Sequence, residues 1–189
     1  MALARQWMTA DEFLALPPTD HDRHLELIDG ELVMDAPKLG HQQIVLWLAH
    51  KIMSWIKQGP DRGKVFTPHV WLTDRDVFGP DLVWLGPDYR YPDDRGVLRA
   101  PPQLVVEVRS PSTWRHDRGH KRERYEAGGV AELWLVDHLT GMIHIHRRSS
   151  PDAPSFDERT ILHAGDTLIT PLLPGLKLAV TELLAQGEL

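Results

Sequence analysis

The sequence predicts a fold between the α/β and α+β classes, in which a mixed β-sheet is flanked by helices. Two apolar strands, near residues 103–109 and 132–136, enclose a charged helical segment. This strand–helix–strand order is typical of a crossover between parallel strands. Hairpins near Asp29-Gly30 and residues 137–141 add antiparallel pairs. Together these pairings predict one mixed sheet with helices on its faces.

The length and composition indicate a globular protein. The 189 residues suit a single domain, with a core over about residues 24–147 and a peripheral segment over 148–189. Hydrophobic residues make up 42% and charged residues 25% of the chain, as in ordinary soluble proteins. The absence of cysteine excludes disulfides and thiolate metal ligands. The net charge of −6 argues against general nucleic-acid binding, so such contact would need a local basic patch.

The sequence predicts no contact with a membrane. No apolar run approaches the about 18 residues of a membrane span. Asp11 and Glu12 stand where a signal peptide would need its apolar core. We therefore expect a cytoplasmic location.

The N-terminal region predicts a short helix followed by a hairpin. Residues 9–12 match a capping box that begins a helix, and two prolines end that helix after Leu16. Residues 24–28 and 31–34 flank Asp29-Gly30, which is the strongest short-range signal for a hairpin. We expect this hairpin to be an N-terminal extension of the fold.

A long helix and several short strands follow. Residues 39–57 carry apolar side chains at spacings of three and four, which predicts a helix. Residues 65–66 and 70–72 are typical of short strands. The segment 78–85 predicts an apolar strand that opens with an acid, Asp81.

The C-terminal half predicts a loop, a charged helix and further strands. Residues 86–102 form a loop whose length is uncommon unless it is functional or mobile. A charged helix is expected over residues 113–127, and a strand at 142–146 pairs with the apolar strand before it. A strand near 157–162 and a short helix over 181–185 complete the chain.

One acid interrupts the apolar strand at 103–109. Because side chains alternate on a strand, Glu107 and Arg109 share a face. A buried charge is costly unless it has a partner or a metal ion. If the strands that carry Asp81 and Glu107 are neighbours, the two carboxylates converge on Mg²⁺ or Mn²⁺. The backbone carbonyl of Val108 is the natural third ligand.

The same acids also fit an ordinary ion-paired arrangement. Asp81 would then end a turn after Gly79-Pro80, and Glu107 would pair with Arg109 or another cation. Residue chemistry alone leaves both interpretations open.

The charged helix supplies candidate cations for such a site. Asp117 and Lys121 are four residues apart on one face, which could present Lys121 to the acids. Arg118 and Arg122 belong to a basic run that suits a phosphate-bearing substrate. Such a run is more often a solvated face.

Other polar residues are weaker candidates. Glu26 and Glu31 flank the first hairpin and His41 opens the long helix, so any of them could approach the acids. His144 and His146 share a strand face and could bind a softer metal, although no third ligand is visible.

These motifs together resemble the Uma-two family of restriction-endonuclease-like proteins. The resemblance runs from about residue 9 to residue 147, and the order and spacing of its motifs make it specific. The matching stretches are LELIDGELV at 25–33, His41, PDLV at 80–83, LVVEV at 104–108, SPST at 110–113, DRG at 117–119 with Lys121, Tyr125, GV at 129–130 and ELWLVD at 132–137.

The resemblance implies the PD-(D/E)xK nuclease fold and a metal-dependent phosphodiesterase site. It implies that Asp81 and Glu107 ligate Mg²⁺. Lys121 would replace the lysine that usually stands on the strand, and Glu26 or Glu31 would be an accessory acid.

Arg109 departs from the apolar residue that is usual in the family. Arg109 either shares the role of Lys121 or pairs with Glu107 and weakens metal binding. An arginine cannot act as a base, so it can only stabilise charge or orient water. Leu133, where an aromatic residue is common, is a change in packing.

We therefore expect a Mg²⁺-dependent (or Mn²⁺-dependent) endonuclease that hydrolyses DNA phosphodiester bonds with an activated water. The alternative is a non-catalytic module of the same fold that binds nucleic acid or a protein partner, which the net charge of −6 and Arg109 favour. A weaker third hypothesis is a histidine-metal hydrolase that uses His144 and His146. A homodimer would suit cleavage of two strands, although no residue requires one.

Overall fold

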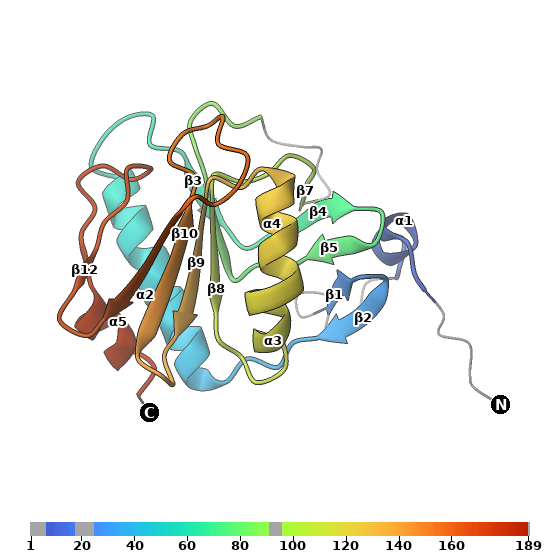
Figure 1. Cartoon of the computed structure of the whole chain (residues 1–189), viewed down its shortest axis with the longest axis horizontal. Coiled ribbons are helices and arrows are strands. Elements are labelled where there is room, and N and C mark those ends of the chain that lie inside the picture. The colour runs from blue at the N-terminus through green and yellow to red at the C-terminus, as the bar shows by residue number, and fades with distance from the viewer. Residues whose placement is uncertain (1–6, 18–24, 91–95, 189) are drawn as a thin grey trace.

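The structure is a computed structural model, and it describes residues 7–17, 25–90 and 96–188. In this part of the chain, a central six-stranded sheet has a second, five-stranded sheet beside it (Figure 1). The long helix α2 (Leu39–Ile56) lies behind the central sheet in Figure 1, and the α3–α4 segment lies in front of it. The predicted α+β fold with a mixed sheet and flanking helices is confirmed.

Both large sheets contain parallel and antiparallel pairs. In spatial order the central sheet contains β11 (Glu158–His163), β10 (Met142–Arg147), β9 (Glu132–Asp137), β8 (Leu104–Val108), β6 (Leu82–Leu85) and β3 (Lys64–Phe66). The second sheet contains β2 (Glu31–Met34), β1 (Leu25–Ile28), β5 (Asp76–Phe78), β4 (His69–Thr73) and β7 (Val97–Leu98). Strands β8 and β9 are parallel, which confirms the predicted crossover.

The remaining elements are short. They are α1 (Ala10–Leu14), α3 (Trp114–His116), the π-helical segment η2 (Asp117–Lys121), α4 (Arg122–Gly128), α5 (Val180–Ala185) and the small pair β12 (Thr167–Leu168) and β13 (Leu178–Ala179). The capping box at Thr9 and Glu12 is present. The Asp29-Gly30 turn joins β1 to β2, and both of its residues have positive φ.

Alternate residues of β8 face two different apolar cores. Leu104, Val106 and Val108 belong to the core that contains the buried residues of α2. Val105 belongs to the other core, together with Tyr125 of α4. Because side chains alternate along a strand, Glu107 lies on the Val105 face and points toward the α3–α4 segment.

The segment 78–85 is divided between the two sheets. Phe78 ends β5 in the second sheet, whereas β6 of the central sheet begins at Leu82. Pro80 lies between them and has no backbone N–H for a ladder, so the predicted single strand is interrupted there. Asp81 therefore lies at the point where the chain passes from one sheet to the other. The hairpin β1–β2 is likewise part of the second sheet, because Leu27 pairs with Val77.

The C-terminal segment after residue 148 takes part in the fold. Strand β11 forms one edge of the central sheet and pairs with β10 along its whole length. The buried apolar residues of this segment in the α2 core are Leu168, Leu173, Leu176, Leu178, Val180 and Leu183. Part of the predicted loop 86–102 forms β7, and its residues 91–95 lie outside the described residues. No helix in the described ranges is both long and apolar enough to cross a membrane.

Candidate active site

A cavity of about 670 Å³ lies where the two sheets meet the beginning of α2. The charged and imidazole side chains that line it are Glu26, Asp35, His41, His69, Asp81, Glu107 and Lys121. The predicted acids Asp81 and Glu107 are both in this group, as is the predicted cation Lys121.

The antiparallel pairing of β6 and β8 brings the two predicted metal ligands together. Leu82 pairs with Val106, so Asp81, one residue earlier, lies beside Glu107, one residue later. The backbone N–H of Val108 donates a hydrogen bond to Asp81 Oδ2 at 2.6 Å. This bond fixes the orientation of the Asp81 carboxylate.

The carbonyl of Val108 points toward the same side of the strand as Asp81. The N–H of Arg109 donates to the Val136 carbonyl of β9 at 2.9 Å. In a trans peptide the carbonyl of one residue points opposite to the N–H of the next. The Val108 carbonyl is therefore directed away from β9, toward the Asp81 edge of β8.

Lys121 is buried against three carboxylates. Its Nζ lies 2.7 Å from Glu107 Oε1, 2.9 Å from Glu26 Oε1 and 3.1 Å from Asp117 Oδ1. The lysine is 1% exposed and Glu107 is 3% exposed. The three acids come from β1, from β8 and from the π-helical segment that also carries Lys121. The structure thus brings together Glu107, Lys121 and Glu26, three of the residues predicted from the sequence.

Two further groups hold these acids in place. The hydroxyl of Tyr125 donates to Glu107 Oε1 at 2.7 Å, and the backbone N–H of Gly79 donates to Glu26 Oε1 at 2.7 Å. Tyr125 is buried, and burial beside Glu107 raises the pKa of its hydroxyl well above its usual range. Tyr125 therefore acts here as a hydrogen-bond donor.

Burial dominates the protonation of the three acids. It raises the pKa of Glu107 well above its ordinary range, and it also raises the pKa values of Glu26 and Asp117, although Lys121 opposes the shift in each case. Burial alone would lower the pKa of Lys121. The charges of Asp117, Glu107 and Glu26 outweigh that effect and hold the pKa of the lysine well above its usual range.

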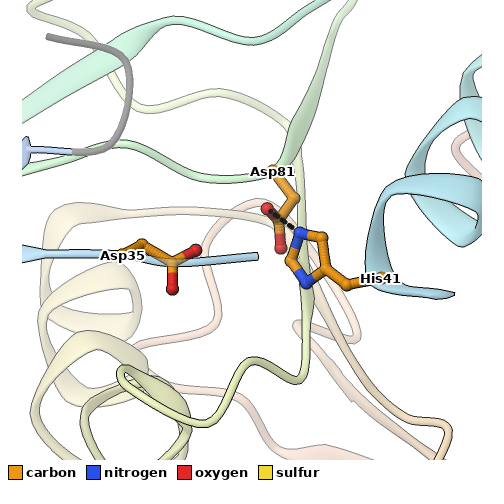
Figure 2. A group of neighbouring side chains, drawn as sticks. All are labelled: Asp35, His41 and Asp81. Atoms are coloured by element: carbon orange, nitrogen blue, oxygen red, sulfur yellow. Dashed lines mark hydrogen bonds and ion pairs between the residues drawn. The ribbon is translucent and has the colours of Figure 1, made fainter. Parts of the chain in front are cut away.

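A second group of polar residues lies on the other side of Asp81. His41, in the first turn of α2, places its Nε2 atom 2.9 Å from Asp81 Oδ1. Asp35, directly after β2, points its carboxylate toward this pair (Figure 2). One ligand atom from each of Asp35, His41 and Asp81 lies within 4.8 Å of the other two. Burial lowers the pKa of His41, but the Asp81 hydrogen bond and the nearby acids outweigh it and raise the pKa overall.

The SPST motif at residues 110–113 anchors Asp35. The hydroxyls of Ser110 and Ser112 each donate to Asp35 Oδ1 at 2.6 Å. The Ser110 hydroxyl oxygen also lies 2.8 Å from that of Thr113, and the Thr113 hydroxyl donates to Asp117 Oδ2 at 3.1 Å. Close polar contacts therefore lead from Asp35 to Asp117, whose other oxygen contacts Lys121. Sequence reasoning missed Asp35, because it stands in a polar connection where aspartate is ordinary.

Arg109 does not reach the site. Its Nη1 atom lies 3.0 Å from both carboxylate oxygens of Asp137 at the end of β9. The register explains this: Val108 pairs with Val136 in the parallel ladder, so Arg109 and Asp137 are the next neighbours. Arg109 thus pairs with Asp137 and not with Glu107, and it does not line the cavity.

The other basic residues of the helix point elsewhere. Arg122 pairs with Glu123 at 3.3 Å and with Glu126 at 3.6 Å. Arg118 is exposed, and its charge acts on His144 of β10. Neither arginine lines the cavity, and Glu31 of β2 does not line it either. The N-terminal acid that the structure brings to the site is Glu26.

The histidine pair of β10 has no third metal ligand beside it among the residues that the structure describes. Burial lowers the pKa of His144, and it lowers the pKa of His146 to about 4. His146 packs against the ring of Phe156. In the described residues, the group with metal-ligand spacing is Asp35, His41 and Asp81, and it contains neither of these histidines.

The residues of the cavity fit a divalent cation. The described lining contains four carboxylates and one lysine, so acids are in excess. The Oε2 atom of Glu26 is buried and has no hydrogen-bond partner among the described residues. Carboxylate oxygens and a backbone carbonyl are the ligands that Mg²⁺ and Mn²⁺ prefer.

Comparison with known proteins supports a nuclease-like fold. The Uma2 (Uma-two) family model, described as "Putative restriction endonuclease", matches residues 10–181. A crystal structure described as "a putative nuclease belonging to DUF820 from Anabaena variabilis" superposes with a TM-score of 0.79 at 19% identity. The match covers 95% of this chain and 99% of that one, and at this identity it shows the fold alone. No curated protein matches the sequence.

Proposed function

Because the chain belongs to the Uma2 family, we propose that it is a divalent-metal-dependent endonuclease that hydrolyses phosphodiester bonds in DNA. The observation that carries this proposal is the meeting of Asp81, Glu107 and Lys121 at one cavity. Two acids at neighbouring strand positions with a buried lysine beside them are what metal-assisted phosphoryl chemistry needs.

In this proposal Asp81, Glu107 and the carbonyl of Val108 hold Mg²⁺ or Mn²⁺. Such an ion, when bound, polarises a phosphoryl oxygen and lowers the pKa of a bound water. The Val108 N–H and the His41 imidazole keep the Asp81 carboxylate in one orientation. Tyr125 does the same for Glu107. These bonds preorganise the ligands, so little reorganisation is needed when substrate arrives.

Lys121 supplies the fixed positive charge of the site. Its ammonium lies 2.7 Å from Glu107, so a phosphate held near Glu107 is within its reach. There it stabilises the negative charge that develops on the phosphoryl oxygens. Because the pKa of Lys121 is raised, the lysine stays protonated and acts as a charge stabiliser. Glu26 serves as the accessory acid that holds Lys121 in place, at 2.9 Å.

A plasmid-nicking assay with Mg²⁺ and Mn²⁺ tests the proposed function. We expect the wild-type chain to convert supercoiled DNA to the nicked form, with no cleavage in the presence of a chelator. Asp81→Asn and Glu107→Gln should each lower the rate by about a hundredfold or more. The control is Glu123→Gln, which changes an exposed glutamate of α4 and should retain wild-type activity.

Two outcomes would count against the endonuclease. One is nicking that persists unchanged in both acid variants, which would indicate a contaminating nuclease. The other is the absence of metal-dependent nicking by folded wild-type protein. That second result would favour the non-catalytic module of the same fold, which the net charge of −6 also favours.

A further inference from the structure

We propose a second cation position, formed by Asp35, His41 and Asp81, that takes a transition-metal ion such as Mn²⁺ in preference to Mg²⁺. Its ligand atoms lie within 4.8 Å of one another. It differs from the position at Glu107 and Val108 and shares only Asp81 with it. The proposal rests on the proposed function in that shared residue and in the anionic substrate.

The spacing of His41 and Asp81 already suits two ligands of one ion. Two ligands at about 2.1 Å from an octahedral ion and at right angles to each other are about 3.0 Å apart. The distance from His41 Nε2 to Asp81 Oδ1 is 2.9 Å. An ion can therefore replace this hydrogen bond without a large movement of either side chain.

Asp35 has one oxygen engaged and the other available. Its Oδ1 atom accepts the hydroxyls of Ser110 and Ser112 at 2.6 Å and the N–H of Ala36 at 2.8 Å. Three donors on one oxygen fix the carboxylate plane and leave Oδ2 for a further partner. In Figure 2 this carboxylate faces the Asp81–His41 pair across a short gap.

The charge of the cavity gives an independent reason for a second ion. Four acids and Lys121 line it, and the buried Oε2 atom of Glu26, which is 3% exposed, has no hydrogen-bond partner in the described part of the chain. One divalent ion leaves the formal charge of this lining negative, whereas two ions make it positive. A phosphodiester is an anion, so the lining attracts it only in the second case.

The imidazole determines which ions this position selects. Mg²⁺ takes oxygen ligands, whereas a histidine nitrogen is better accepted by first-row transition-metal ions, among which Mn²⁺ binds most weakly. The position at Glu107 and Val108 offers oxygen atoms only. The two positions should therefore differ in their preference, with the His41 position filled by Mn²⁺ at concentrations where Mg²⁺ leaves it largely free.

Mn²⁺ binding to the full chain, followed by the electron paramagnetic resonance signal of free Mn²⁺, tests this proposal. Wild type should bind two ions, and Asp35→Asn and Glu107→Gln should each bind one. Asp152→Asn, which alters an exposed aspartate, is the matched control and should bind two. A single ion in wild type that survives Asp35→Asn would overturn the proposal.

Pulsed electron paramagnetic resonance on bound Mn²⁺ gives a second readout, whose first result is obtained on the wild-type protein. Wild type should show coupling to a nitrogen of histidine, and His41→Gln should lose it. His144→Gln is the control and should retain it. Absence of nitrogen coupling in wild type loaded with two ions would also overturn the proposal. Neither readout involves cleavage, so two bound ions without nicking would reject the endonuclease and leave this site intact.

Discussion

The centre of the site contains more buried negative charges than positive ones. Glu26, Glu107 and Asp117 share one ammonium, that of Lys121. Three carboxylates cannot all be balanced by one cation, and burial raises the pKa of each. Electrostatic repulsion among these acids therefore destabilises the folded, metal-free protein by an amount that depends on pH.

We expect Glu107→Gln to become increasingly stable relative to wild type as the pH rises. The folded-state pKa of Glu107 lies well above the ordinary value of 4.5, so the folded state binds more protons than the unfolded state. Stability then falls as the pH rises through that range, and glutamine removes this penalty. Urea unfolding with a chelator between about pH 5 and about pH 8 measures the difference. A gap that narrows with rising pH would contradict the expectation.

Arg109→Gln should lower stability and leave nicking unchanged. The change removes two bonds of 3.0 Å to Asp137, whose side chain is 5% exposed. Hydrogen bonds between charged groups contribute about 1.5–3 kcal/mol, so a loss of about 2 kcal/mol in the free energy of unfolding is expected. Arg115→Gln, at an exposed position before the π-helical segment, is the control and should change neither quantity. Loss of nicking in a folded Arg109→Gln variant would return Arg109 to the catalytic set.

At the scale of elements, the π-helical segment η2 places the lysine of the site. Asp117 and Lys121 are its first and last residues, both are buried, and Tyr125 follows one turn later in α4. Such π segments inside α-helices occur frequently at functional sites. The predicted charged helix is therefore present, but its middle is wound more loosely than an α-helix.

Two glycines of this helical region should respond in opposite ways to alanine. A Cβ at Gly119 would meet no atom within 4 Å, so Gly119→Ala should raise the free energy of unfolding by about 0.5–1 kcal/mol. Gly129 ends α4 with φ of 91°, where a side chain is strained, so Gly129→Ala should lower it by about 1–2 kcal/mol. Chemical denaturation of both variants gives the signs, and equal signs would refute this account.

The sequence showed which residues interrupt an apolar strand, but it did not show which residues they contact in the folded protein. Asp81 and Glu107 stood out because each interrupts an apolar run, which is a local signal. Asp35 carried no such signal, because its role comes from Ser110 and Ser112, which lie 75 and 77 residues later in the chain. The partner of Arg109 was not predicted for the same reason. Its partner Asp137 is set by the register of β8 and β9, which no local pattern reveals.

At the scale of the whole molecule, the site lies on the boundary between the two sheets. Glu26 comes from the second sheet, and Lys121 comes from the helix that covers the central sheet (Figure 1). A second contact of this kind lies nearby, because Asp76 of β5 has His120 Nε2 2.7 Å from its Oδ1 atom and Arg124 Nε 3.0 Å from its Oδ2 atom. The ionic groups of the site therefore also join the two sheets.

Lys121→Met should lower the free energy of unfolding by about 3 kcal/mol or more, because it leaves buried carboxylates without their cation. Urea unfolding near neutral pH with a chelator measures this change. Lys51→Met is the matched control, since Lys51 is more exposed and lies 3.8 Å from an exposed glutamate, Glu182. That variant should stay within about 0.5 kcal/mol of wild type. Equal stability of the two variants would show that the cluster does not hold the sheets together.

The fold as a whole was predictable, but its division into two sheets was not. The α+β class followed from the crossover around Glu107 and from the Asp29-Gly30 hairpin. The separation depends on Gly79-Pro80, where a missing backbone donor ends one strand and the chain enters the other sheet. A Pro between two apolar stretches also fits an edge strand or a bulge, so the sequence could not distinguish these outcomes.

Lys121 joins the two sheets and, in the proposed function, also stabilises phosphoryl charge. These two roles affect how such a site is conserved in evolution. A lineage that ceased to cut DNA would still be selected to keep Lys121, Glu26 and Glu107, because their loss would loosen the joint between the sheets. Retention of these three residues in a relative is thus weak evidence that the relative is an active enzyme. Asp35 and His41, which flank Asp81 and make no contact with Lys121, are freer to change, so they are the positions at which an inactive descendant would first differ.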